Sequence, residues 1–224
     1  WNSLSPVEKQ HTIEGFSYQL GKVESASVRQ QNVDLLVNVD QQLANTVADN
    51  IGVQRPSGSH VPVDINYPSL SQKTTPKYAA TLKVGVLIGD RFNTQEVTSV
   101  LHTLQENGVF YTIISDTLGT VRGHDGTNLE VDETFITSSP HLVDALYVVG
   151  GSSNNEQKFR YHMNKFVRVA YEHYKPIGIA TTGEPFLQTT ENNNLEGVFF
   201  SRNQPNFANE FIEGICQMRF WSRT

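Results

Sequence analysis

The strongest constraint in this sequence is the alternation, from residue 80 onward, of short apolar runs with longer amphipathic segments. Residues 83–88 (KVGVLI) form a run of the kind that fills a buried parallel strand. Residues 94–106 then place Val97, Val100 and Leu104 at helical spacing before Gly108. This order predicts a strand followed by a helix that crosses back over the sheet.

The same alternation continues to the end of the chain. We predict strands at 109–114, 145–149, 177–180 and 198–201, helices at 155–174 and 206–220, and a small hairpin around Asp125-Gly126. Repeated strand–helix–strand units require a mostly parallel sheet with right-handed connections and helices on both faces. The predicted fold class is therefore α/β, a flavodoxin-like three-layer sandwich spanning residues 79–224.

Residues 1–53 read as three short helices. Ser5-Pro6-Val7-Glu8 combines a hydroxyl N-cap, a proline in the first turn and a glutamate that can bond back to the cap. A second helix is predicted at 27–39 and a third after Asp40, ending at Gly52. Apolar residues at helical spacing are Phe16, Leu20 and Val23 in the first helix and Leu43, Val47 and Ile51 in the third. Because these stripes are narrow, we expect the helices to need a partner surface.

Residues 54–78 are predicted to be an extended linker. Four prolines, Pro56, Pro62, Pro68 and Pro76, lie among Ser and Thr without a sustained period.

Charge and composition exclude several functions. A net charge of −6 argues against nucleic-acid binding, which requires a basic surface. No run has the roughly 20 apolar residues that span a bilayer, and no signal segment is recognisable, so a cytoplasmic location is favoured over secretion. Cys216, the single cysteine, excludes an internal disulfide. The start at Trp1 suggests a piece of a longer protein.

In a sheet of this type, ligands bind beyond the carboxyl ends of the strands. The loops to inspect are 89–93, 150–153 and 181–184. Gly150-Gly151 could form an anion-binding nest or simply a tight turn. Phosphate-binding glycine motifs are absent from the sequence, which disfavours a nucleotide.

The third loop has the form of a nucleophile elbow, with Thr181, Thr182 and Gly183 at its apex. A threonine needs a neighbouring base to act as a nucleophile, and the sequence places none beside it. Cys216 lies among apolar residues of the last helix, so we expect a buried core cysteine. We therefore predict a degenerate elbow with no catalytic residue.

We also predict no metal site. The seven histidines show no metal-binding spacing; they are His11, His60, His102, His124, His141, His162 and His173. The acidic residues near the hairpin, Asp125, Glu130, Asp132 and Glu133, read as solvated charges.

Two stretches carry a family resemblance. The opening, with SPVEK and VDLLVNVDQQLA, resembles the late helical region of large-subunit monofunctional haem catalases. The stretches KVGVLIGDRF, HDGTNLEVDETF, YVVGG and RFWSR resemble the additional carboxy-terminal domain of that class. That domain is similar in fold to class I glutamine amidotransferase-like proteins, which include PfpI-type proteases and glyoxalase-chaperones.

The resemblance also indicates which chemistry should be missing. Thr181 stands where the amidotransferase-like enzymes carry cysteine, and Glu96 lies near the position of their glutamate. In the catalase family the haem ligands lie upstream of this segment. The resemblance therefore implies haem in the parent enzyme and no cofactor in this chain.

The resemblance implies a non-catalytic carboxy-terminal part of a peroxide-decomposing catalase. Its partners would be the remainder of the catalase chain and its homotetramer, to which it would add stability, and unfolded client proteins when isolated. Two alternatives stay open: a PfpI-like hydrolase or glyoxalase, and a flavin or small-ligand binding module.

Overall fold

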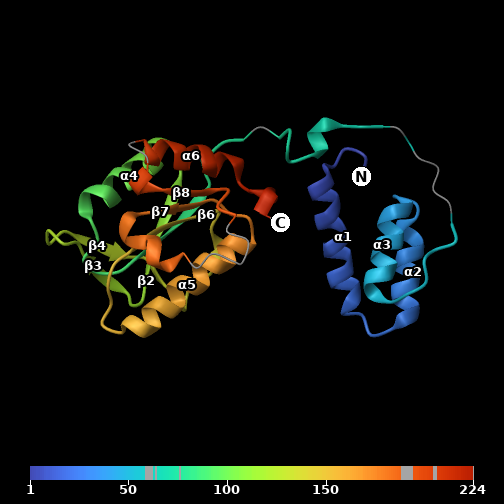
Figure 1. The fold of residues 1–224 in the computed structure, drawn as a ribbon, viewed down its shortest axis with the longest axis horizontal. Coiled ribbons are helices and arrows are strands. Elements are labelled where there is room, and N and C mark those ends of the chain that lie inside the picture. The colour runs from blue at the N-terminus through green and yellow to red at the C-terminus, as the bar shows by residue number, and fades with distance from the viewer. Residues whose placement is uncertain (59–62, 64, 76, 188–193, 204–205, 224) are drawn as a thin grey trace. The chain divides into compact units, whose positions relative to one another are not determined.

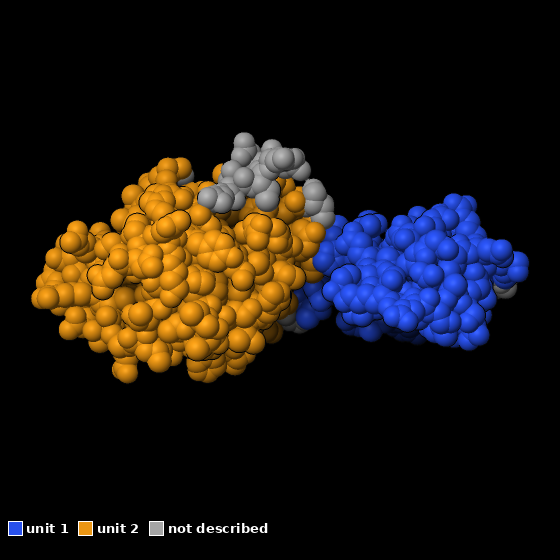
Figure 2. All heavy atoms as spheres, turned by 90° about the horizontal axis from the view of Figure 1, so that it is seen from below, with its two compact units in different colours: residues 1–76 blue, residues 77–224 orange. Residues whose placement is uncertain are grey.

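The computed structural model describes residues 1–58, 63, 65–75, 77–187, 194–203 and 206–223. The chain divides into two compact units, residues 1–76 and residues 77–224 (Figures 1 and 2). His60, Pro62 and Pro76, which the sequence analysis considered, lie outside the described residues.

The first unit contains three α-helices: α1 (Pro6–Gly21), α2 (Ala26–Leu36) and α3 (Gln41–Ile51). The predicted capping box is confirmed, since Ser5 N donates to the Glu8 carboxylate and Glu8 N donates to Ser5 Oγ. Asp40 caps α3 as predicted, and Gly52 ends it with a φ of 68°, which glycine adopts without strain.

The three helices share a small apolar core of their own, which the narrow stripes did not predict. It is centred on the buried side chains Val33, Leu43, Ala44, Val47 and Ala48. In α1 the buried residue is Ile13, whereas Phe16, expected on the apolar stripe, is 41% exposed. The helix is rotated so that Ile13 and Ser17, which lie one turn apart, face α3 instead of Phe16. Ser17 Oγ accepts a 3.0 Å hydrogen bond from Asn50 of α3.

Part of the proline-rich segment packs on α1. A short 3₁₀ helix, η1 (Pro68–Leu70), precedes Ser71, which is buried. Ser71 Oγ and the Gln72 backbone N–H donate to the two oxygens of Glu8, at 2.8 and 2.6 Å. The carboxylate that completes the capping box therefore also holds this segment.

The second unit contains six parallel strands: β1 (Lys83–Ile88), β2 (Phe110–Ser115), β5 (Glu133–Thr134), β6 (Ala145–Gly150), β7 (Ile177–Ile179) and β8 (Val198–Phe200). Their order is β5-β2-β1-β6-β7-β8. Without the two-residue edge strand β5, the order is 2-1-3-4-5, which is that of flavodoxin-like sheets. The predicted fold class is confirmed.

Helices cover both faces of this sheet (Figure 1). On one face, α4 (Thr94–Glu106) and α6 (Phe207–Gln217) pack on side chains such as Val84, Val86 and Tyr147. On the other face, α5 (Glu156–Glu172) packs on Leu87, Leu146 and Val148. The strands are apolar on both sides because both faces are covered.

The predicted hairpin is present as an antiparallel pair, β3 (Gly119–Arg122) and β4 (Asn128–Val131). Several details differ from the prediction, among them the end of the second helix, which lies at Leu36 rather than at residue 39. Strand β5 was missed, because two residues carry no periodicity. The last helix ends at Gln217 rather than near residue 220, since Met218 takes a φ of 60° that an α-helix cannot continue.

Candidate functional site

The elbow predicted at residues 181–184 is a short 3₁₀ helix, η3 (Thr181–Phe186), directly after β7. Gly183 is buried against β6, and a Cβ atom there would lie 2.1 Å from the Val148 carbonyl oxygen. Only glycine fits such a close backbone approach. This contact places Thr181 and Thr182 at the carboxyl end of the sheet.

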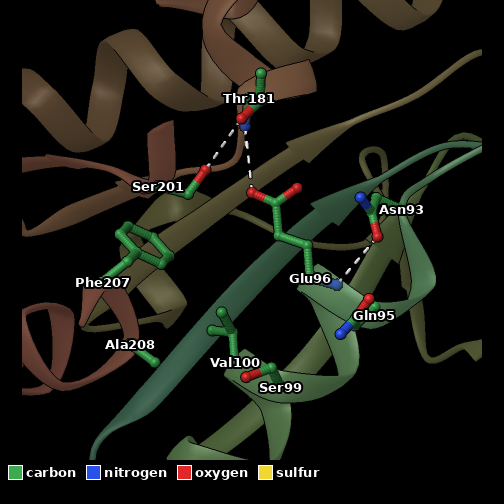
Figure 3. Close-up of a pocket in the computed structure, with 9 residues that line it drawn as sticks. All are labelled: Asn93, Gln95, Glu96, Ser99, Val100, Thr181, Ser201, Phe207 and Ala208. Atoms are coloured by element: carbon green, nitrogen blue, oxygen red, sulfur yellow. Dashed lines mark hydrogen bonds between the residues drawn. The ribbon is translucent and has the colours of Figure 1, made fainter. Parts of the chain in front are cut away.

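The elbow faces the start of α4 (Figure 3). Thr181 N donates a long hydrogen bond, 3.4 Å, to Glu96 Oε1, and Asn93 positions Glu96 by accepting from its backbone N–H. Thr181 Oγ1 lies 3.3 Å from Ser201 Oγ. The Thr182 hydroxyl donates to the Val149 carbonyl oxygen at 2.7 Å. The structure therefore brings Glu96 to the elbow, although it lies 85 residues away in sequence.

These residues line a cavity of about 410 Å³ at the strand ends. Its lining combines one carboxylate, several amides and hydroxyls, and an apolar side: Asn93, Gln95, Glu96, Ser99, Val100, Thr181, Ser201, Phe207 and Ala208 (Figure 3). Among these described residues there is neither a cysteine nor a histidine. A hydroxyl needs a neighbouring base to act as a nucleophile, and among these lining residues the group that could act as one is the Glu96 carboxylate, which accepts from the Thr181 backbone N–H.

Gly150 is the last residue of β6 and Gly151 follows it, and neighbouring backbone lies close to both. A Cβ atom on Gly150 would lie 2.3 Å from the Thr182 carbonyl oxygen, and one on Gly151 would lie 2.6 Å from that of Asp90. Asp90 and Ser152 also form a two-way backbone bridge, with N···O distances of 2.7 and 2.8 Å. The space beside both glycines is therefore filled by the neighbouring loops.

A smaller cavity, of about 240 Å³, lies beside the loops that follow β1, β2 and β6, and its lining includes Asp90, Asp116 and Ser153. Its most buried charged group is Asp116, which accepts from Ser153 Oγ at 3.0 Å and lies 3.7 Å from Lys158 Nζ. The charges lining this cavity are thus partly paired with one another.

Cys216 is half-buried on α6 and packs at the margin of the core, so the expectation of a fully buried cysteine is not met. It lies near the helix end, where the apolar face meets solvent. It is not among the residues that line the cavity beside Thr181.

Three of the four acidic residues at the hairpin make structural contacts, whereas Glu130 is exposed, in line with the expected solvated charge. Asp125 Oδ1 accepts from Thr94 Oγ1 at 2.6 Å, which ties the hairpin to α4. Asp132 Oδ2 accepts from the Ile113 backbone N–H at 2.7 Å, and Glu133 lies 3.6 Å from Lys83 Nζ.

Sequence reasoning missed one cluster, the pair His141 and His173, whose Nε2 atoms lie 3.1 Å apart. His141 precedes β6 and His173 precedes β7, and these strands are parallel neighbours. Parallel strands begin at the same edge of a sheet, so two histidines that precede neighbouring strands can be expected to lie close together. This was the signal in the sequence that could have predicted the pair. Within the part of the chain that the structure describes, no three His, Cys, Asp or Glu side chains gather into a metal-binding group.

Haem requires an axial ligand and a pocket that excludes water. Of the two cavities at the strand ends, neither is lined by a tyrosine, histidine, cysteine or methionine side chain that could bind haem iron. These cavities therefore do not fit a haem. In the described helices, no span is long and apolar enough to cross a membrane.

The fold and this elbow define a class: a three-layer α/β domain whose elbow carries threonine. Comparison with known families then extends the assignment. Residues 80–224 match the family described as the C-terminal domain found in long catalases, and residues 1–51 match the family described as catalase-related immune-responsive. This chain belongs to the long-catalase family and corresponds to its C-terminal region.

Individual relatives agree with this assignment. The chain is 40% identical to a catalase of Alkalihalophilus pseudofirmus and 39% identical to Catalase-2 of Bacillus subtilis, with all of the chain covered in both cases. It is 30% identical to Catalase HPII of Mycobacterium avium. The chain spans about a third of the length of these relatives (33, 33 and 34%).

Proposed function

We propose that this chain is a non-catalytic part of a haem catalase, and that it acts through its surfaces. In the parent enzyme it would stabilise the homotetramer. The single observation that carries the proposal is the elbow: it carries an exposed threonine, Thr181, whose hydroxyl lies 3.3 Å from the hydroxyl of Ser201.

The exposed apolar side chains support a role in contacts with other protein surfaces. In the helical unit, Tyr18 and Leu35 are 63% and 66% exposed. In the second unit, Leu118 and Ile136 are 64% and 71% exposed. Covering apolar side chains of this size with another protein surface lowers the free energy of the system, because it removes apolar area from water. The remainder of the catalase chain, or a neighbouring subunit, would cover them in the parent enzyme.

The test is a comparison of the parent catalase with a variant that ends just before Lys77. We expect unchanged peroxide turnover per haem, together with a shorter half-life on heating and a reduced tetramer fraction in light-scattering mass measurements. Unchanged heat stability and an intact tetramer would contradict the structural role. Lost turnover per haem in an intact tetramer would instead assign the segment a part in the chemistry.

For the isolated chain we propose chaperone-like binding of unfolded proteins through the same apolar side chains. Light scattering of a heated client enzyme should fall when the chain is present in several-fold molar excess. A variant with Leu35→Ser and Tyr18→Ser should suppress aggregation less, whereas Thr181→Ala, at the elbow, should act like the unchanged chain. No suppression at this excess would contradict the proposal.

The elbow geometry gives a hydrolase one supporting contact, the approach of Glu96 to Thr181. If the chain were a PfpI-like hydrolase that uses its only cysteine, Cys216→Ser would abolish peptide or ester hydrolysis. We expect no hydrolysis that depends on Cys216.

A further inference from the structure

The two histidines that the fold brings together lie at the amino edge of the sheet, away from the cavity beside Thr181. His141 belongs to a short 3₁₀ helix, η2 (Pro140–Leu142), before β6. His173 is the C-cap of α5, before β7. Both side chains are exposed, so an ion from solution can reach them.

The geometry of the pair suits a shared ion. The Nε2 atoms lie 3.1 Å apart and the ring planes differ by 71°. Two imidazole nitrogens, each about 2.0–2.1 Å from a tetrahedral metal ion, lie about 3.3 Å apart. The two Nε2 atoms share a hydrogen bond, so one of them carries a proton. Both lone pairs can bind one ion once that proton moves to the other ring nitrogen or is displaced and the rings turn towards a common point.

The hydrogen bond at the other ring nitrogen of His141, Nδ1, also suits a histidine that binds a metal ion through Nε2. Ser139 Oγ lies 2.9 Å from His141 Nδ1 and can accept a hydrogen bond from the Nδ1–H group. With the proton on Nδ1, the Nε2 atom carries the free lone pair. Histidine ligands are commonly oriented by a hydrogen bond from their other ring nitrogen.

The groups around the pair favour the neutral form of His173 and also place positive charge near it. Burial, followed by the charges of His141, Lys175 and Arg219, lowers the pKa of His173, and Glu172 opposes this effect. The Lys175 ammonium donates to the carbonyl oxygens of Pro140 and Val143, which offsets part of its charge. Asp144 lies near Lys175 and Arg219 and supplies a further negative charge.

We propose that His141 and His173 form a two-histidine site for a divalent transition metal ion, with copper(II) bound most tightly. Imidazole suits copper, nickel and zinc, and affinity for nitrogen ligands generally peaks at copper(II). Water or an external ligand would fill the remaining coordination positions, since the described residues supply no third protein ligand here.

The test is titration of the 224-residue chain with copper(II) and with zinc(II) alone, at pH 7.5, by calorimetry. We expect a saturable site that binds copper(II) more tightly than zinc(II). His141→Ala and His173→Ala should each weaken binding at least tenfold, because loss of an outer contact alone costs about 10- to 100-fold. The matched control is His102→Ala, which removes an exposed histidine on α4 that pairs with Glu106; its affinity should stay unchanged.

Electron paramagnetic resonance of the copper(II) complex provides a second readout. The spectrum should show two imidazole nitrogens, and one of them should be lost in His141→Ala. Circular dichroism confirms that each variant is folded. Binding should also weaken in acid, because protons compete for the same nitrogens. Copper binding that is unchanged in both histidine variants, or the absence of a saturable site, would overturn the proposal.

Discussion

At the scale of single residues, two buried tyrosines differ in how their hydroxyls are satisfied. Tyr147, in the core under α4 and α6, has a buried hydroxyl with no hydrogen-bond partner among the described residues. Burial raises its pKa well above the usual value, and the charge of Glu96 adds to this effect. Tyr171 is also buried, but its hydroxyl donates to the Asn194 carbonyl oxygen.

We predict opposite effects when each hydroxyl is removed. An unsatisfied buried polar group costs about 1–3 kcal/mol, so Tyr147→Phe should raise the free energy of unfolding by about 1 kcal/mol. Tyr171→Phe should lower it by about 1 kcal/mol, because it removes a formed hydrogen bond and leaves the Asn194 carbonyl oxygen unpaired. Urea unfolding measures both. A Tyr147→Phe variant less stable than the unchanged chain would show that its hydroxyl has a partner such as a buried water.

At the scale of structural elements, the elbow depends on glycines where backbones approach closely. Gly150 and Gly119 both have positive φ, 80° and 111°. A Cβ atom on Gly150 would collide with the Thr182 carbonyl, whereas one on Gly119 would meet nothing within 4 Å. Both substitutions by alanine carry backbone strain of about 1–2 kcal/mol, but only Gly150→Ala adds a collision.

We therefore predict that Gly150→Ala destabilises the second unit by at least about 2 kcal/mol more than Gly119→Ala does. Thermal unfolding followed by Trp221 fluorescence gives the comparison. Equal losses for the two variants would contradict the proposed close contact between the β6 end and the elbow.

A second element-scale prediction concerns the junction of α1 with residues 71–72. Burial raises the pKa of Glu8, but hydrogen bonds from Ser5, Ser71 and Gln72 outweigh it and lower the pKa to about 2. A lowered pKa contributes stability above the unfolded value near 4.5, and this contribution is lost as the pH falls towards 2.

For the partly exposed Glu8 we expect this contribution to be about 1–2 kcal/mol after solvent screening. Glu8→Gln should lower the stability of the first unit at pH 7, and should flatten its pH dependence between about pH 5 and 2. Urea unfolding over this range, followed by circular dichroism, measures it. An unchanged pH profile in the variant would contradict the role of the carboxylate.

Sequence patterns predicted elements whose signals are local. Strand 83–88 and helix 94–106 were predicted with the bounds observed for β1 and α4, because β1 is a continuous apolar run and α4 has apolar residues at helical spacing. Contacts between distant residues were not predictable in the same way. The approach of Glu96 to Thr181 and the pairing of His141 with His173 both depend on strand order, which no single segment encodes.

At the scale of the whole molecule, each unit has its own apolar core. The first is centred on Leu43 and Val47, and the second lies on both faces of the sheet. Together the units match the C-terminal third of long catalases. Neither strand-end cavity offers a side chain that could bind haem iron. These observations support the proposal that the chemistry of the parent enzyme lies outside this segment.

The most direct test is one absorbance spectrum and one oxygen-electrode trace for the 224-residue chain after incubation with haem. We predict no stable Soret band after gel filtration and no oxygen release from hydrogen peroxide above that of free haem. A chain that retains stoichiometric haem and releases oxygen catalytically would contradict it.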